Sequence, residues 1–212
     1  MSIEEWLFVE DDGMALDPAL VYDVFARFSI PPGTVIAKLS DMLTDGVQAL
    51  PAPISATFRA LVRVVVDRVG LNQTEYFVEC WSNRTIEVGP MVDYHLDNDE
   101  NLRRKTGHIS VPTWGAIYHA GPGAPEVGGT WFDLPPLDPL EKDRLFASPL
   151  FADVISPEGR LVSFHPGRLV MFDGRCPHCV APFVALPTPR VTIMLNFWPK
   201  ERIPRAYDVL EQ

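Results

Sequence analysis

The chain is poor in cysteine, in positive charge and in long apolar runs, and each shortage excludes a class of protein. Three cysteines, Cys80, Cys176 and Cys179, are too few for a zinc site built from four cysteine ligands. The 18 basic residues are outnumbered by 28 acidic ones, and the net charge of −10 opposes a polyphosphate partner, so we expect no binding to nucleic acid. No apolar run approaches the roughly 20 residues that a membrane span requires, and the stretch 61–66 is interrupted by Arg63. We therefore expect no association with a membrane.

The remaining composition fits one soluble enzyme domain. The chain has 212 residues, of which 47% are hydrophobic, and this is enough for a single sizeable core. Its amino terminus, Met-Ser-Ile-Glu-Glu-Trp, is acidic and lacks both the basic start and the long apolar stretch of a signal peptide, so we expect a cytoplasmic protein. The sequence has no internal repeat and no low-complexity tract. We therefore treat residues 1–212 as one domain.

The expected elements are helices first and strands later. Asp17-Pro18 before an apolar run is typical of a helix start, with aspartate as the N-cap and proline in the first turn. Apolar positions recur every three to four residues over 55–70 and end at a glycine, which predicts a second helix. Later the period falls to two, which predicts strands over 75–82, 109–118, 168–174 and 190–198. We expect a helical amino-terminal support over 1–72 and a β core over 73–200.

Two histidines and one aspartate form a candidate metal site. His95 and Asp97 are separated by one residue, so on a strand both side chains would project to the same face and hold one ion from a rigid backbone. His178 follows the strand and turn predicted over 168–174. Two histidines with one carboxylate are the set that occupies one face of a six-coordinate non-haem iron and leaves the other face open. If the three residues converge, the sequence predicts an oxygenase that uses Fe(II).

The last predicted strand has one apolar face and one mixed face that begins with an arginine. Over 190–198 the apolar residues Val191, Ile193, Leu195 and Phe197 alternate with Arg190, Thr192, Met194, Asn196 and Trp198. An arginine at the start of the mixed face, beside a strand that carries a ligand histidine, would point into the same cavity. Its planar guanidinium suits a carboxylate. The sequence therefore predicts that Arg190 binds a carboxylate near the metal.

The order of these motifs resembles a known family. His95-Leu-Asp97 is followed by Gly-Gly-Thr-Trp-Phe at 128–132, by Pro-Gly-Arg-Leu-Val-Met-Phe-Asp-Gly at 166–174, and then by His178 and Arg190. This combination is similar to the Fe(II)/2-oxoglutarate-dependent oxygenases, nearest their prolyl-hydroxylase-like branch. The resemblance implies a mainly β fold with flanking helices, namely a double-stranded β-helix (jelly-roll, cupin-like) barrel. The stretch between the ligands is long for that branch, which implies an insertion over 133–160 that could form a lid over the substrate.

Carried onto this sequence, the resemblance also implies the cofactors and the reaction. His95, Asp97 and His178 would ligate Fe(II), and Arg190 would bind the 5-carboxylate of 2-oxoglutarate, whose 1-carboxylate and 2-oxo group chelate the metal. The implied reaction uses O2 to hydroxylate a C–H bond of a small molecule, such as an amino acid or a natural-product intermediate, and releases succinate and CO2. Asp97 favours hydroxylation, because the related halogenases lack this carboxylate.

Three other functions remain open. A protein side-chain hydroxylase of the prolyl type would use the same site. A non-catalytic, cupin-like metal-binding module would need the three ligands but not Arg190. A dithiol oxidoreductase is suggested by Cys176-Pro-His-Cys179, although in such enzymes the pair lies at a helix amino terminus soon after the first strand. The same segment offers Cys176, His178 and Cys179 to adventitious zinc.

Several candidate residues also have a simpler structural interpretation. His95 and Asp97 could belong to a surface turn that continues into the acidic segment 97–100, and Arg190 could pair with a surface acid. Three other histidines lack a carboxylate two residues away on the same strand face, so we expect satisfied or solvent-facing side chains at His108, His119 and His165. Strand face and loop position suggest five further pocket residues: Glu79, Asn83, Arg103, Arg104 and Asn196.

Overall fold

The computed structural model describes residues 6–11, 16–27, 34–45, 50–85, 94–121, 128–134, 136, 159–181 and 190–204. The strands and helices are, in chain order, β1 (Leu7–Glu10), α1 (Pro18–Arg27), β2 (Val35–Lys38), α2 (Leu39–Thr44), α3 (Ala52–Val69), β3 (Tyr76–Thr85), α4 (Glu100–Thr106), β4 (Trp114–Ala120), β5 (Gly129–Phe132), β6 (Arg160–Ser163), β7 (Leu169–Asp173), β8 (His178–Ala181), β9 (Arg190–Pro199) and the 3-10 turn η4 (Lys200–Arg202). Most of the insertion predicted over 133–160 lies outside the described residues, so the lid stays a prediction.

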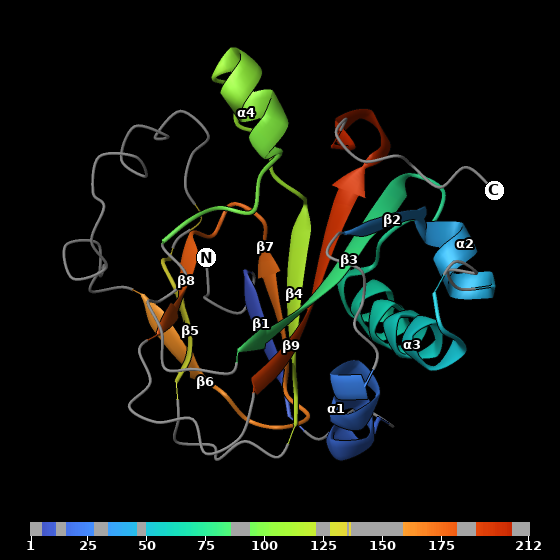
Figure 1. Ribbon diagram of the computed structural model, residues 1–212. Coiled ribbons are helices and arrows are strands. Elements are labelled where there is room, and N and C mark those ends of the chain that lie inside the picture. Colours follow the sequence, from blue (N-terminus) through green and yellow to red (C-terminus); the bar gives the residue numbers. More distant parts are fainter. Residues whose placement is uncertain are drawn as a thin grey trace.

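Two antiparallel sheets pack against each other (Figure 1). The larger has six strands in the order β1-β7-β4-β9-β3-β2, and the smaller has three in the order β6-β5-β8. A cluster of buried side chains joins them, with Ile117 and Phe172 from the larger sheet and Phe132 and Val162 from the smaller. This arrangement is that of a jelly roll, and it confirms the mainly β fold with flanking helices that the sequence predicts.

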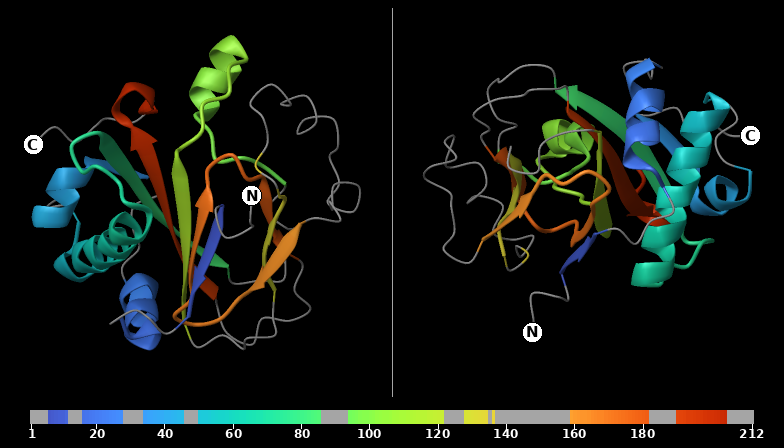
Figure 2. Two further views of the ribbon diagram at one scale, coloured as in Figure 1. Left: turned by 180° about the vertical axis from the view of Figure 1, so that it is seen from behind. Right: turned by 90° about the horizontal axis from the view of Figure 1, so that it is seen from below.

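Three helices cover the face of the larger sheet that points away from the smaller one (Figures 1 and 2). The longest, α3, begins after Pro51 and ends at Gly70, which adopts a left-handed φ of 71° that glycine tolerates without strain. Asp17 caps α1 as predicted, because its Oδ1 accepts from the backbone N–H of Ala19 at 2.9 Å. The helix α4 projects beyond the sheets and buries none of its residues (Figure 1).

The strand β9 runs through the larger sheet, and its alternation decides where the site lies. Val191, Ile193, Leu195 and Phe197 point into the core beneath the helices, as the sequence predicts. The alternate residues therefore point to the side of the smaller sheet. The pairing of β9 with both β3 and β4 fixes these positions by backbone hydrogen bonds on both edges.

Not all of the region 1–72 is helical support. The structure adds β1, which pairs with β7, and β2, which pairs with β3, as the two edges of the larger sheet. It also adds the short helix α2. Each of these strands has four residues, too few to display a period of two in the sequence. Among the described residues, no helix combines the length and the apolar character needed to cross a bilayer.

Candidate metal centre

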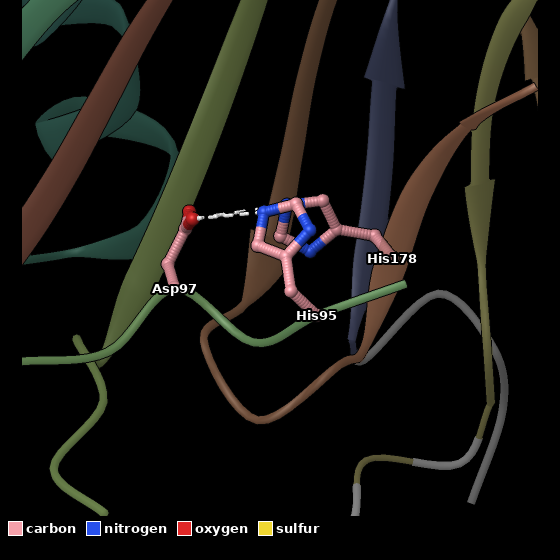
Figure 3. A group of neighbouring side chains, drawn as sticks. All are labelled: His95, Asp97 and His178. Atoms are coloured by element: carbon pink, nitrogen blue, oxygen red, sulfur yellow. Dashed lines mark ion pairs between the residues drawn. The ribbon is translucent and has the colours of Figure 1, made fainter. Parts of the chain in front are cut away.

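His95, Asp97 and His178 come together between the two sheets. His178 is the first residue of β8, whereas His95 and Asp97 lie in the connection that precedes α4. Among the described residues of that connection, 94–99, His95 pairs with a strand through an isolated bridge to His178. The expectation that His95 and Asp97 share one strand face is therefore wrong. Both side chains still point toward His178 (Figure 3).

The three side chains are spaced for one ion. Asp97 Oδ1 lies 3.5 Å from His95 Nε2 and 3.9 Å from His178 Nε2, and one ligand atom from each residue lies within 4.8 Å of the others (Figure 3). The side chain of His178 is 3% exposed, that of Asp97 11% and that of His95 36%. The group is thus closed on the His178 side and open on the His95 side. The surface-turn interpretation of His95 and Asp97 does not fit this burial.

The hydrogen bonds of His178 leave one ring nitrogen for a ligand. Its Nδ1–H donates to the carbonyl oxygen of Cys176 at 3.2 Å, so Nε2 carries the lone pair. This Nε2 is buried, and no described residue bonds to it. Burial, together with the nearby His95, lowers the pKa of His178 to about 4, so the ring is neutral at physiological pH. A neutral imidazole with a buried, unused lone pair fits a metal ion.

Asp97 is held in its ionised form and in one orientation. Burial alone would raise the pKa of its carboxyl, but His178, His95 and Asn196 hold the pKa below its ordinary value. In the amide orientation that satisfies both of its ends, Asn196 Nδ2 donates to Asp97 Oδ2 at 3.2 Å. Oδ1 is left facing the two histidines. Asn196 therefore orients the carboxylate from outside the candidate ligand set.

A small cavity connects these residues to Arg190. It has a volume of about 100 Å³, and its lining includes His95, Asp97, His178, Arg190, Thr192 and Met194. The residues from β9 are the alternate positions that the sequence places on one face. The structure thus puts Arg190 on the same cavity as the three candidate ligands.

Arg190 is a buried cation that forms no ion pair with an acid among the described residues. The residue is 5% exposed, and its Nη1 has no hydrogen-bond partner in the described part of the chain. Its Cζ lies 4.9 Å from the centroid of the Phe164 ring. Burial lowers the pKa of Arg190 to about 10, so the guanidinium remains charged at neutral pH. A buried, incompletely bonded guanidinium fits an anionic ligand better than the surface ion pair considered from the sequence.

The other nearby arginines are engaged elsewhere. Arg168 forms a two-pronged ion pair with Asp11, with Nη2 at 2.8 Å from Oδ2, and also donates to the carbonyl of Ser163. Arg175 forms a similar pair with Asp173. Neither lines the cavity that the candidate ligands and Arg190 share.

The cysteines are placed as core residues. Cys80, Cys176 and Cys179 are all free and fully buried. Burial raises the pKa of the Cys176 thiol strongly and that of Cys179 to about 12, whereas a dithiol enzyme needs a lowered pKa. Among the described residues, the grouping of metal-binding side chains consists of the two histidines and Asp97. The dithiol and zinc interpretations are therefore disfavoured.

The five further pocket candidates fall into three groups. Asn83 lines the cavity, whereas Glu79 and Asn196 are buried and lie opposite each other on β3 and β9. Arg103 lines a second cavity, of about 210 Å³, which also includes His95. The remaining candidate, Arg104, is an exposed partner of Glu100.

His119 differs most from expectation. It is fully buried, and its Nε2 has no partner among the described residues. No local pattern in the sequence indicates this burial, because it depends on the elements that pack around β4.

Known structures with this fold include HygX from Streptomyces hygroscopicus. HygX with nickel and 2-oxoglutarate bound matches with a TM-score of 0.59 at 12% identity, over 92% of this chain and 82% of HygX. The form with nickel, 2-oxoglutarate and hygromycin B bound matches at 0.56 and 11% identity, over 92% and 83%. The iron-bound form matches at 0.55 and 11%, over 92% and 83%. At such low identity the likeness establishes the fold. No family model and no curated protein matches the sequence.

Proposed function

We propose that the protein is an Fe(II)- and 2-oxoglutarate-dependent dioxygenase. One observation carries the proposal: His95, Asp97 and His178 line the same small cavity as the buried Arg190, whose Nη1 lacks a partner. Three ligands from two histidines and one carboxylate suit a non-haem iron with open positions. A buried guanidinium nearby suits a ligand that carries a carboxylate at some distance from the metal. 2-Oxoglutarate has that form, because its metal-binding 2-oxo acid group and its 5-carboxylate lie at opposite ends.

The fold supports this assignment by analogy. Crystal structures of HygX hold nickel with 2-oxoglutarate, or iron, in a protein of the same fold. When bound here, the iron would activate O2 in the net reaction 2-oxoglutarate + O2 + R–H → succinate + CO2 + R–OH. His95, Asp97 and His178 would hold the metal, and Arg190 would hold the 5-carboxylate.

The protein residues around the ligands have distinct roles in this proposal. The bond from His178 Nδ1–H to the Cys176 carbonyl keeps Nε2 available, and Asn196 holds Asp97 with Oδ1 toward the histidines. Phe172 packs against the ring of His178 with a centroid distance of 4.8 Å, which excludes water from the closed side of the site. The charge of Arg190 would be neutralised by the carboxylate that it binds.

The substrate is proposed to be a small molecule that reaches the metal from the His95 side. The second cavity, of about 210 Å³, shares His95 with the first and is lined by Tyr94, Asn98, Glu100 and Arg103 among others. HygX binds hygromycin B, a small molecule, in a structure of the same fold. Hydroxylation of a protein side chain is the second candidate substrate class. The acidic net charge disfavours nucleic acid as the substrate.

A non-catalytic metal-binding module is the alternative of a different class. In such a module, a buried cation beside the metal would destabilise the fold without binding a ligand, because an unpaired charge in the interior is costly. Arg190 therefore favours an enzyme that binds a carboxylate.

The test needs no substrate. Fe(II) and then 2-oxoglutarate are added to the purified protein without oxygen, and the visible metal-to-ligand charge-transfer band of the chelate is followed. We expect a saturable band at one Fe(II) per chain. Fe(II) binding without a saturable band at millimolar 2-oxoglutarate would reject the cosubstrate and favour the non-catalytic module.

A further inference from the structure

His119 lies on the face of the larger sheet that points toward the smaller sheet, next to the cavity that Arg190 lines. Its strand, β4, places it directly opposite Thr192 of β9. Thr192 lines the cavity, and so does Ile117, which lies two residues before His119 on the same face of β4. The His119 ring is fully buried and stacks on Phe164, with a centroid distance of 4.7 Å and an interplanar angle of 21°. Its position is thus fixed by packing.

The hydrogen bonding of His119 determines where its proton lies. The backbone N–H of His165 donates to Nδ1 at 3.2 Å, so Nδ1 carries the lone pair. Burial, and then the charge of Arg190, hold the pKa of His119 below its ordinary value, so the ring is neutral. A neutral ring with its lone pair on Nδ1 carries its proton on Nε2. This Nε2–H is buried and has no acceptor within the described residues.

Two unused donors therefore share one aromatic neighbour. The ring of Phe164 stacks with His119 and also lies under the guanidinium of Arg190, at 4.9 Å from Cζ. Arg190 Nη1 and His119 Nε2 are both buried and both lack an acceptor in the described part of the chain. Buried donors are ordinarily bonded, so two of them in one neighbourhood indicate a ligand with acceptor oxygens.

We propose that His119 is a second binding residue for the distal carboxylate of the cosubstrate, with Nε2–H donating to one oxygen while Arg190 binds the group as a cation. This inference rests on the proposed function. The neutral imidazole adds a directed donor without adding charge, so one carboxylate compensates Arg190 and satisfies both orphan donors. His119 would thus help to select 2-oxo acids that end in a second carboxylate.

The test compares two 2-oxo acids and two substitutions. 2-Oxopentanoate has the same carbon chain as 2-oxoglutarate but lacks the distal carboxylate. In His119→Asn, the amide oxygen can replace Nδ1 as acceptor for the His165 N–H, but no donor reaches the position of Nε2. In His119→Gln, the longer side chain can bring an amide N–H near that position. Both ligands are titrated into each anaerobic Fe(II) protein while the charge-transfer band is followed.

We expect His119→Asn to weaken 2-oxoglutarate binding roughly ten- to hundredfold, as for a lost hydrogen bond to a charged group. Binding of 2-oxopentanoate should change less than about threefold, and His119→Gln should recover part of the loss. Fe(II) binding serves as the folding control, because His119 is not a metal ligand. Arg190→Met should produce the same ligand-selective pattern with a larger loss.

Other outcomes overturn the inference in distinguishable ways. Equal weakening of both ligands by His119→Asn would assign His119 a packing role alone. Unchanged 2-oxoglutarate binding in both variants, with normal binding in the wild type, would reject the hydrogen bond but leave the proposed function intact. A wild-type protein that binds Fe(II) but neither 2-oxo acid would overturn the proposed function together with this inference.

Discussion

The carboxyl group of Glu79 accepts a hydrogen bond of 2.7 Å from the indole Nε1–H of Trp198 in the interior of the larger sheet. Both residues are buried, and Glu79 lies directly opposite Asn196 across the β3–β9 pair. Burial raises the pKa of Glu79 to about 7, and the bond from Trp198 only partly offsets this. A group of this kind makes the stability of the protein depend on pH.

We expect Glu79 to lower the free energy of unfolding progressively as the pH rises from about 4.5 to about 7. Over this interval the unfolded chain has released the Glu79 proton while the folded protein still holds it, so rising pH favours unfolding. In the metal-free protein, Glu79→Gln should therefore raise the free energy of unfolding above pH 7 by up to roughly 3 kcal/mol. The gain should fade below pH 4.5. Urea denaturation at several pH values measures the free energy of unfolding of the wild type and of Glu79→Gln. A difference between the two proteins that stays the same at every pH would contradict the prediction.

Replacement of any candidate ligand should weaken metal binding. His95→Ala, Asp97→Ala and His178→Ala each remove one of three ligands, so we expect Fe(II) affinity to fall by more than about a hundredfold, since outer residues alone are worth ~10–100-fold. Anaerobic Fe(II) titration measures the loss. Cys176→Ala is the control, because the bond that Cys176 accepts from His178 is made by its backbone carbonyl, which the substitution keeps. Wild-type affinity in all three ligand variants would reject the site.

Asn196 should influence the metal without touching it. Asn196→Ala removes the 3.2 Å bond to Asp97 Oδ2, so the carboxylate loses its fixed orientation and Fe(II) affinity should fall by about 10- to 100-fold. Asn83→Ala is a matched control, because Asn83 lines the same cavity but has no such role. Equal Fe(II) affinity in the two variants would mean that Asp97 needs no outside support.

Arg190 should lower the stability of the ligand-free protein and strengthen the binding of 2-oxoglutarate. Arg190→Met removes a buried charge, so the ligand-free protein should become more stable by about 1 kcal/mol or more, while 2-oxoglutarate binding should lose ~2–5 kcal/mol. Arg190→Lys should retain part of the binding, because a lysine supplies the charge but not the two-pronged donor. Thermal melting and the charge-transfer titration measure the two effects. A Met variant that loses stability and binds 2-oxoglutarate normally would place the carboxylate elsewhere.

Several structural features can be predicted from the sequence because they depend on residues that are close together along the chain. Asp17 and Gly70 mark where α1 begins and where α3 ends, through capping and a left-handed turn. The alternation over 190–198 sorts the side chains of β9 between the helix-covered core and the cavity. The identities and order of His95, Asp97, His178 and Arg190 are sufficient to predict the kind of site that they could form.

Other features depend on contacts between segments far apart in the chain, which no local pattern records. The strands β1 and β2 form by pairing with the distant strands β7 and β3, respectively. His95 and Asp97 reach His178 from a connection and not from a strand, because the backbones of the two histidines bond to each other at 3.0 and 2.8 Å. The support of Asp97 by Asn196 likewise arises only when the sheets pack. The same holds for Arg190 Nη1 and His119 Nε2, which are buried without a partner among the described residues. Burial determines which polar groups lose contact with water.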